Sequence, residues 1–182
     1  MNNILIFPTD TVYGMGASIT DIASLKDIFV IKNRELNKRL AVLCYDLEQI
    51  KQIAYVTDDA IKLINKYLPG GLSIILKTKE SYISELIGDT IAVRIPNHEL
   101  ALSLLKEIGP MATTSVNVSS EPPINDYNEI KKIYDGKVKK IYNNDKDLDG
   151  VSSTVINLTT KEVTLIREGN ISFEEILKTM NN

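Results

Sequence analysis

Apolar positions along the chain follow two periods, and each period predicts one kind of element. Short apolar and β-branched runs predict strands. These runs cover residues 4–7, 40–44, 72–76, 90–95, 111–115 and 138–142. Residues 152–158 and 162–167 predict a hairpin around a short turn. The strands are short and numerous, as in a sheet that is covered by helices.

Apolar residues spaced three and four positions apart predict helices between these strands. The predicted helices start at residues that can cap the first turn, or just after a proline: Asp21, Asp46, Thr57 or Asp58, His98, Asp126 and Ser172. Ser172 with Glu175 forms a capping box for a last helix over 173–180. Alternating strands and helices predict an α/β fold, and the hairpin favours a mixed sheet. We therefore expect a single domain over residues 1–182, a twisted open mixed sheet with flanking helices.

Composition narrows the class of protein. Of the 182 residues 43% are hydrophobic, enough for one buried core without disulfide or metal. The net charge of −3 argues against a surface that coats nucleic acid. Residues 26–39 nevertheless hold five basic side chains against two acidic ones. This segment predicts either a site for one anionic ligand or a solvated helix end, and composition favours neither.

Several common kinds of site are missing from the sequence. It contains no phosphate-binding loop of the G-x-x-x-x-G-K-[ST] type and no complete dinucleotide fingerprint. One histidine, His98, and one cysteine, Cys44, cannot form a zinc site of the usual kind. We expect both to be structural, since neither has an activating neighbour in sequence. No signal peptide or run of eighteen apolar residues is visible, so we expect a cytoplasmic protein without a membrane span.

Polar residues gather where the predicted strands end. Thr9 and Thr11 follow the first strand, Arg94 ends an apolar strand, and Thr113, Ser115 and Asn117 alternate along another. Such positions bind ligands in open α/β sheets. Each segment also has a structural explanation when it is taken alone. This is turn chemistry for Thr9 and Thr11, a surface position for Arg94 and ordinary strand propensity for Thr113.

Taken together, these segments resemble one family. The ordered runs are PTDTVYG, K-x-R at Lys32 and Arg34, PGGLSIIL, VRIP, ATTSVNVSSEPP, SSTVINL and LIREG. They resemble the YrdC-like threonylcarbamoyl-AMP synthases over about residues 4–172. The chain departs from the family pattern at Glu35 and Arg39, where proline is common, and at Leu68 and Ser120. It resembles the short form without an extra C-terminal domain.

The resemblance implies a YrdC-like fold with a concave basic cleft. It also implies a nucleotidyltransferase that joins L-threonine, bicarbonate and ATP, with Mg²⁺, into threonylcarbamoyl-adenylate for a tRNA threonylcarbamoyl transferase complex. Such chemistry needs positioning and charge neutralisation rather than a protein nucleophile. Lys32 and Arg34 are the implied catalytic residues, and we expect both to be solvent-accessible when no ligand is bound. The implied ATP-binding residues are Lys32, Arg34, Lys38, Ser115, Asn117 and Arg167. The implied threonine-binding residues are Thr9, Arg94, Thr113 and Ser153.

Two other functions share features with this one. A basic groove also suits RNA, but the aromatic residues are not interleaved with basic ones as single-strand binding favours, so only weak RNA binding is expected. Carbamoyl transfer of the hydrogenase-maturation type is associated with much longer chains that carry added zinc-binding regions.

Overall fold

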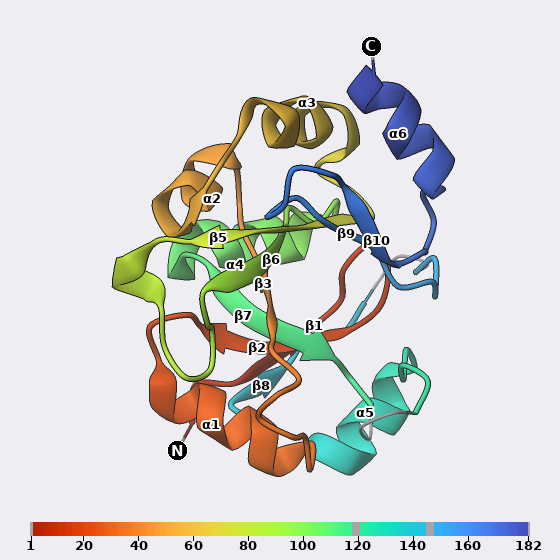
Figure 1. Cartoon of the computed structure of the whole chain (residues 1–182). Helices are drawn as coiled ribbons and strands as arrows, with labels where there is room; N and C mark the ends of the chain where they lie inside the picture. Colours follow the sequence, from red (N-terminus) through yellow and green to blue (C-terminus); the bar gives the residue numbers. More distant parts are fainter. Residues whose placement is uncertain (1, 118–120, 145–147, 182) are drawn as a thin grey trace.

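The computed structural model describes residues 2–117, 121–144 and 148–181. These residues form one mixed ten-stranded sheet in the order β10-β9-β5-β6-β3-β7-β2-β1-β8, with β4 paired to β5 (Figure 1). The strands are β1 Leu5–Phe7, β2 Gly14–Ser18, β3 Ala41–Leu43, β4 Ala54–Tyr55, β5 Leu72–Thr78, β6 Thr90–Arg94, β7 Met111–Ser115, β8 Lys140–Ile141, β9 Thr154–Asn157 and β10 Thr164–Arg167. The pairs β1–β8, β3–β6 and β5–β9 are parallel and the others antiparallel, so the predicted mixed sheet is confirmed.

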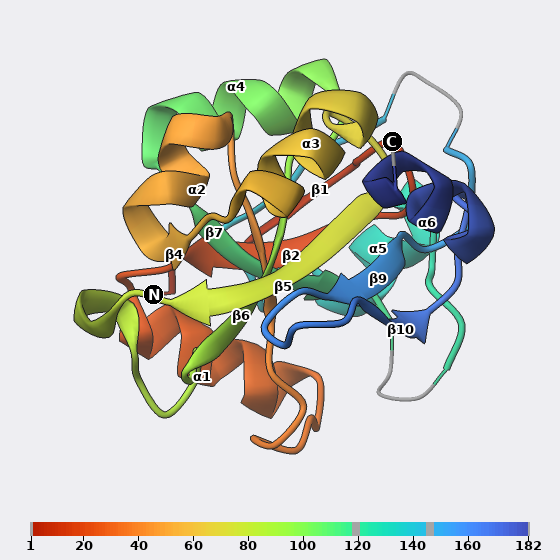
Figure 2. The ribbon, with the colours of Figure 1, turned by 45° about the horizontal axis from the view of Figure 1, so that its top comes forward.

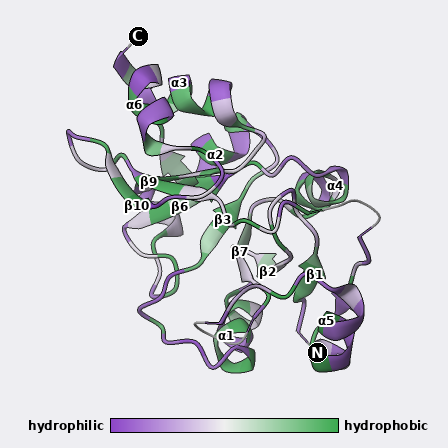
Figure 3. Ribbon diagram, turned by 90° about the vertical axis from the view of Figure 1, so that its right-hand side faces the viewer, coloured by the Kyte–Doolittle hydropathy of each residue, from purple (hydrophilic) through white to green (hydrophobic). Residues whose placement is uncertain are grey.

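Helices cover both faces of this sheet. They are α1 Ile22–Ile31, α2 Leu47–Ile53, α3 Asp58–Tyr67, α4 Glu99–Ile108, α5 Tyr127–Tyr134 and α6 Phe173–Asn181. In the view of Figure 2, α2, α3 and α4 lie above the strands and α1 below them. Buried residues of α1, α2 and α3 nevertheless share one apolar cluster, and those of α4 belong to a second one. Helices α1, α3 and α5 carry both hydrophobic and hydrophilic residues along their length, as helices that cover a core do (Figure 3).

Alternation along the strands divides the core between the two faces. Leu43 of β3 and Met111 of β7 pack with α4 in one apolar cluster. Their neighbours Val42 and Ala112 belong instead to the main cluster, which also contains Leu25 of α1. Because side chains alternate along a strand, Ala41 and Thr113 share the face of Leu43 and Met111. The α4 cluster therefore covers one end of this face and leaves the other end open.

Strand β2 was not predicted, because its sequence, GMGAS, contains two glycines. Glycine is disfavoured in strands. The structure shows why one is needed at Gly16, which pairs with Thr113 of β7. A Cβ at Gly16 would lie 2.4 Å from Cγ2 of Thr113 and 2.8 Å from the carbonyl oxygen of Ala112. Glycine here lets β2 pack closely against β7.

Candidate functional site

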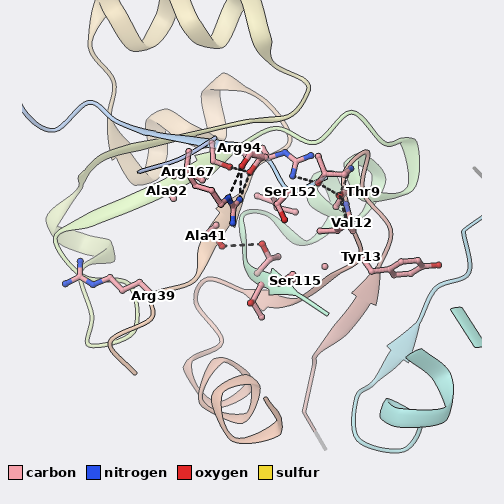
Figure 4. A pocket seen from close by; sticks show the side chains of 18 of the residues that line it. Thr9, Val12, Tyr13, Arg39, Ala41, Ala92, Arg94, Ser115, Ser152 and Arg167 are labelled. Carbon is pink, nitrogen blue, oxygen red and sulfur yellow. Dashed lines mark hydrogen bonds between the residues drawn. The ribbon is translucent and has the colours of Figure 1, made fainter. Parts of the chain in front are cut away.

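A cavity of about 260 Å³ opens on the sheet face beyond the α4 cluster (Figure 4). Its walls come from seven of the strands (β2, β3, β5, β6, β7, β9 and β10) and from the loops beside them. The lining residues are Thr9, Thr11, Val12, Tyr13, Gly14, Arg34, Arg39, Ala41, Leu43, Ser73, Ala92, Arg94, Thr113, Thr114, Ser115, Ser152, Ser153, Val155 and Arg167. The small side chains Ala41 and Ala92 face the cavity from the middle of the sheet, which leaves room for a ligand there.

All four arginines of the chain line this one cavity. None of the lysines in the described ranges does so. Burial lowers the pKa of Arg34, Arg94 and Arg167 from the ordinary value, yet arginine stays charged in proteins. A guanidinium presents five N–H donors in a planar fork that fits carboxylate or phosphate oxygens. The lining is therefore chemically suited to an anionic ligand.

Arg94 is held at the end of β6 by three contacts. Its Nε donates to the carbonyl oxygen of Gly70 at 2.8 Å, and Nη1 donates to the hydroxyl of Thr11 at 2.8 Å. Its Nη2 forms an ion pair with Asp10 at 2.5 Å, and both side chains are largely buried. Asp10 thus supplies an anionic partner for Arg94 within the protein. Three of five N–H groups are used, which leaves one on each Nη for a ligand.

Arg34 and Arg167 are oriented by backbone carbonyl groups. Nε and Nη2 of Arg167 donate to the carbonyl oxygen of Ser153, at 3.2 and 2.8 Å. Arg34 donates to the carbonyl oxygens of Lys38 and Arg39, at 2.7 and 3.0 Å. Neither guanidinium has a carboxylate partner within the described part of the chain, so the positive charge of each remains available to an anion.

The structure brings most of the predicted site residues together. The seven that line the cavity are Thr9, Arg34, Arg94, Thr113, Ser115, Ser153 and Arg167. Three do not line it: Lys32, Lys38 and Asn117. The hydroxyl of Ser115 donates to Oδ1 of Asn117 at 3.0 Å, so Asn117 supports a lining residue from behind.

Lys32 was expected to be solvent-accessible, and that expectation is wrong. Its side chain leaves the end of α1 and only 2% of the residue is exposed. The ammonium donates to the hydroxyl of Thr114 at 3.2 Å, to the carbonyl oxygen of Ser115 and to Oδ1 of Asn117 at 2.6 Å. Burial, and then the charge of Arg34, lowers the pKa of Lys32 to about 7. In this arrangement Lys32 fastens α1 to the end of β7.

Arg39 lines the cavity, whereas its exposed neighbour Lys38, which the family resemblance implied, does not. Strand parity could have found it, because residues 39, 41 and 43 share one face of a strand. Thr11 and Ser152 also line the cavity, although neither was assigned to ATP or to threonine from the sequence. Both lie in polar segments that the sequence had already marked.

The remaining candidates have structural surroundings. Nε2 of His98 shares a hydrogen bond with Oδ1 of Asn144 at 3.1 Å, and burial raises the pKa of the Cys44 thiol. Among the described residues, no three His, Cys, Asp or Glu side chains converge as metal ligands. No helix in the described ranges is long and apolar enough to cross a membrane.

The comparisons with known proteins agree with this geometry. A family model named Sua5/YciO/YrdC, described as telomere recombination, matches residues 1–169. The chain belongs to the Sua5/YciO/YrdC family. Both the family resemblance and the mixed α/β fold predicted from the sequence are confirmed.

Three Sua5/YciO/YrdC relatives give the scale of the similarity. A threonylcarbamoyl-AMP synthase of Pyrococcus abyssi is 35% identical over 179 residues, covering 96% of this chain and 53% of that protein. A crystal structure of P. abyssi Sua5 complexed with L-threonine matches with a TM-score of 0.91 over 97% of this chain and 53% of that one. A putative threonylcarbamoyl-AMP synthase of Methanocaldococcus jannaschii is 35% identical, covering 96% of this chain and 84% of that protein.

The third relative is Escherichia coli YciO. Its crystal structure matches with a TM-score of 0.87 at 27% identity, covering 96% of this chain and 87% of that one. The present chain thus spans about half the length of the P. abyssi protein but most of the other two.

Proposed function

We propose that the chain converts L-threonine, bicarbonate and ATP to L-threonylcarbamoyl-adenylate and pyrophosphate. The observation that carries the proposal is the clustering of all four arginines around one hydroxyl-lined cavity. The fold match to a Sua5 structure complexed with L-threonine supports it. The relatives from P. abyssi and M. jannaschii carry the same activity in their names, which the second qualifies as putative.

The chemistry proceeds in two steps. The amine of threonine adds to the carbon of bicarbonate, water leaves, and a carbamate forms. A carbamate oxygen then attacks the α-phosphorus of ATP, and the bond to the β-phosphate oxygen breaks to release pyrophosphate. Neither step needs a protein nucleophile, so orienting the reactants and neutralising phosphate charge are the main tasks left to the protein.

The lining residues divide between the two substrates. We assign Arg34, Arg167 and Ser115 to ATP, and Thr9, Arg94, Thr113 and Ser153 to threonine. Lys32 and Asn117 then act from behind, by fixing Ser115 at the end of β7. Lys38 is exposed beside Arg39 and does not line the cavity, so we assign it no direct contact with ATP.

We expect Mg²⁺ to bind together with ATP. The lining offers hydroxyl oxygens, and no aspartate or glutamate is among the described residues that line it. Mg²⁺ that stays on the phosphate oxygens and water fits this donor set, because it readily keeps several waters. When bound it would offset the triphosphate charge alongside Arg34 and Arg167.

The adenylate would next pass to a tRNA threonylcarbamoyl transferase complex in the cytoplasm. A mixed anhydride of this kind is hydrolysed by water, so a cavity that encloses it also protects it.

The test is pyrophosphate release by the purified chain. Release should require ATP, threonine and bicarbonate together, because no two of them supply both the carbamate and the α-phosphorus. Serine should react about 10–200-fold less efficiently, since a missing methyl group costs roughly 1–3 kcal/mol in a fitted pocket. Release at the same rate without threonine would refute the proposal. Arg34→Ala should lower the rate, while Lys62→Ala, an exposed charge change on α3, should not.

A further inference from the structure

Arg39 lies just before a strand of the sheet, at a position that points to a function beyond its surface ion pair. It precedes β3 by two residues, and Ala41 and Leu43 of that strand both line the cavity. Side-chain alternation places Arg39 on the same face. Ala41 pairs with Thr113 of antiparallel β7, so the same register extended brings Arg39 level with Ser115.

The guanidinium of Arg39 lies at the rim of the cavity, apart from those of Arg94 and Arg167 (Figure 4). Its Nη1 pairs with Asp89 at 3.0 Å and donates to the carbonyl and hydroxyl oxygens of Thr90, both at 3.4 Å. It crosses directly over Gly88, where a Cβ would lie 2.0 Å from Cζ. Gly88 has φ 78°, so glycine gives this loop both its conformation and the space for Arg39.

The present contacts of the Arg39 guanidinium are weak enough for it to bind another anion instead. The side chain of Arg39 is 44% exposed and that of Asp89 is 79% exposed. Ion pairs with this exposure contribute little to stability. All three contacts use Nη1, and Nε and Nη2 make no hydrogen bond to the described residues. Most of the guanidinium fork is therefore open to another anion.

The distance along the sheet indicates which anion reaches it. Leu43 pairs with Arg94 in parallel β3–β6, so Arg39 precedes the level of Arg94 by four residues. At about 3.3 Å per residue this separates them by about 13 Å along the strands. If threonine lies at Arg94, the α-phosphate must be next to it, because the carbamate attacks there. The β- and γ-phosphates leave together and must extend away, toward Arg34 and Arg39.

We propose that Arg39 is a further ATP-binding residue that exchanges Asp89 for the β- and γ-phosphates. The inference rests on the proposed function, and it adds a contact where related chains often carry proline. Asp89 holds the guanidinium at the rim and competes with the phosphates for it. Removing Arg39 and removing the charge of Asp89 should therefore act on ATP affinity in opposite directions.

Titration calorimetry with ATP and with AMP tests this prediction. Arg39→Ala should raise the Kd for ATP about tenfold, equivalent to about 1.4 kcal/mol, and leave the Kd for AMP unchanged. Asp89→Asn should lower the Kd for ATP, because the guanidinium loses its competing partner. Lys62→Ala removes one exposed positive charge from α3 and serves as the control for net charge. Melting curves confirm that each variant is folded.

Three results would overturn the inference. Arg39→Ala could bind ATP as tightly as Lys62→Ala does, which would leave Arg39 no part in binding. Asp89→Asn could weaken ATP binding as much as Arg39→Ala does, which would show that the ion pair serves only to hold the two loops together. Arg39→Ala could weaken ATP and AMP binding equally, which would exclude the outer phosphates. Failure of the wild-type chain to bind ATP would instead count against the proposed function itself.

Discussion

Two aspartate–arginine pairs in this chain have similar chemistry but very different burial, and their removal should have different costs. Asp10 and Arg94 are 2.5 Å apart, with side chains 16% and 7% exposed. Asp89 and Arg39 are 3.0 Å apart, with side chains 79% and 44% exposed. We predict that Asp10→Ala destabilises the fold strongly and that Asp89→Ala hardly does so.

The magnitude follows from what each change leaves behind. Asp10→Ala leaves the Arg94 charge buried without its anion, which costs about 3–5 kcal/mol. It also removes the oxygen that accepts from the backbone N–H of Asn97 at 3.0 Å. A protein of this size loses about 2–4 °C in Tm per kcal/mol, so the expected fall is about 6–20 °C. Asp89→Ala leaves Arg39 in water and should cost less than about 1 kcal/mol.

Urea and thermal unfolding followed by circular dichroism measure both variants under one condition. A loss of 1 kcal/mol or less for Asp10→Ala, equal to that for Asp89→Ala, would refute the reasoning from burial. A double-mutant cycle adds a second check. Adding Arg94→Met to Asp10→Ala should recover part of the lost stability, because it removes the unpaired charge.

Three further predictions concern single residues. Arg94→Lys should weaken threonine binding while ATP binding measured alone stays nearly constant, since an ammonium cannot reproduce a two-pronged contact; a loss of ATP affinity equal to that of Arg34→Ala would contradict this. The lowered pKa of Lys32, about 7 against an ordinary 10.5, means that the unfolded chain binds more protons between these values. The unfolding free energy of the wild type should therefore rise with pH above about 7, relative to that of Lys32→Met. If the two proteins show parallel pH profiles, the pKa of Lys32 is not lowered by folding. Gly16→Ala should destabilise by about 1–3 kcal/mol in urea melts. Gly14→Ala should leave the stability nearly unchanged, because its Cβ would meet no atom nearer than 3.9 Å. Equal stability of the two variants would show that the contact between β2 and β7 is not tight.

Local signals made much of this fold predictable. Asp21, Asp46 and Asp126 each accept a hydrogen bond from the N–H three residues ahead, as capping requires. The capping box also forms, because the Glu175 N–H donates to the Ser172 hydroxyl and the Ser172 N–H donates to the Glu175 carboxylate. These interactions lie within four residues of sequence, so tertiary packing does not need to be known. The unpredicted strand β2 depends instead on its contact with β7, almost one hundred residues away.

The residues of the site were largely predictable from the sequence, but the orientations of their side chains were not. Ordered polar segments were enough to select Thr9, Arg94 and Thr113, which line the cavity. Whether a side chain at the end of α1 turns into the cavity or behind β7 depends on the packing of both elements. For that reason Lys32, which was expected to be solvent-accessible, lies buried. Arg39, which was not predicted as a site residue, lines the cavity.

The confinement of every arginine to one cavity makes chemical labelling unusually informative in this chain. A dicarbonyl reagent that reacts with guanidinium groups can modify the protein only at residues that line the cavity. The exposed lysines offer no such selectivity, because they are spread over the helices and loops. Peptide mass spectrometry after labelling would thus report occupancy at Arg34, Arg39, Arg94 and Arg167 separately. Reactivity that falls at Arg34, Arg39 and Arg167 with ATP and at Arg94 with threonine would map both substrates in one experiment.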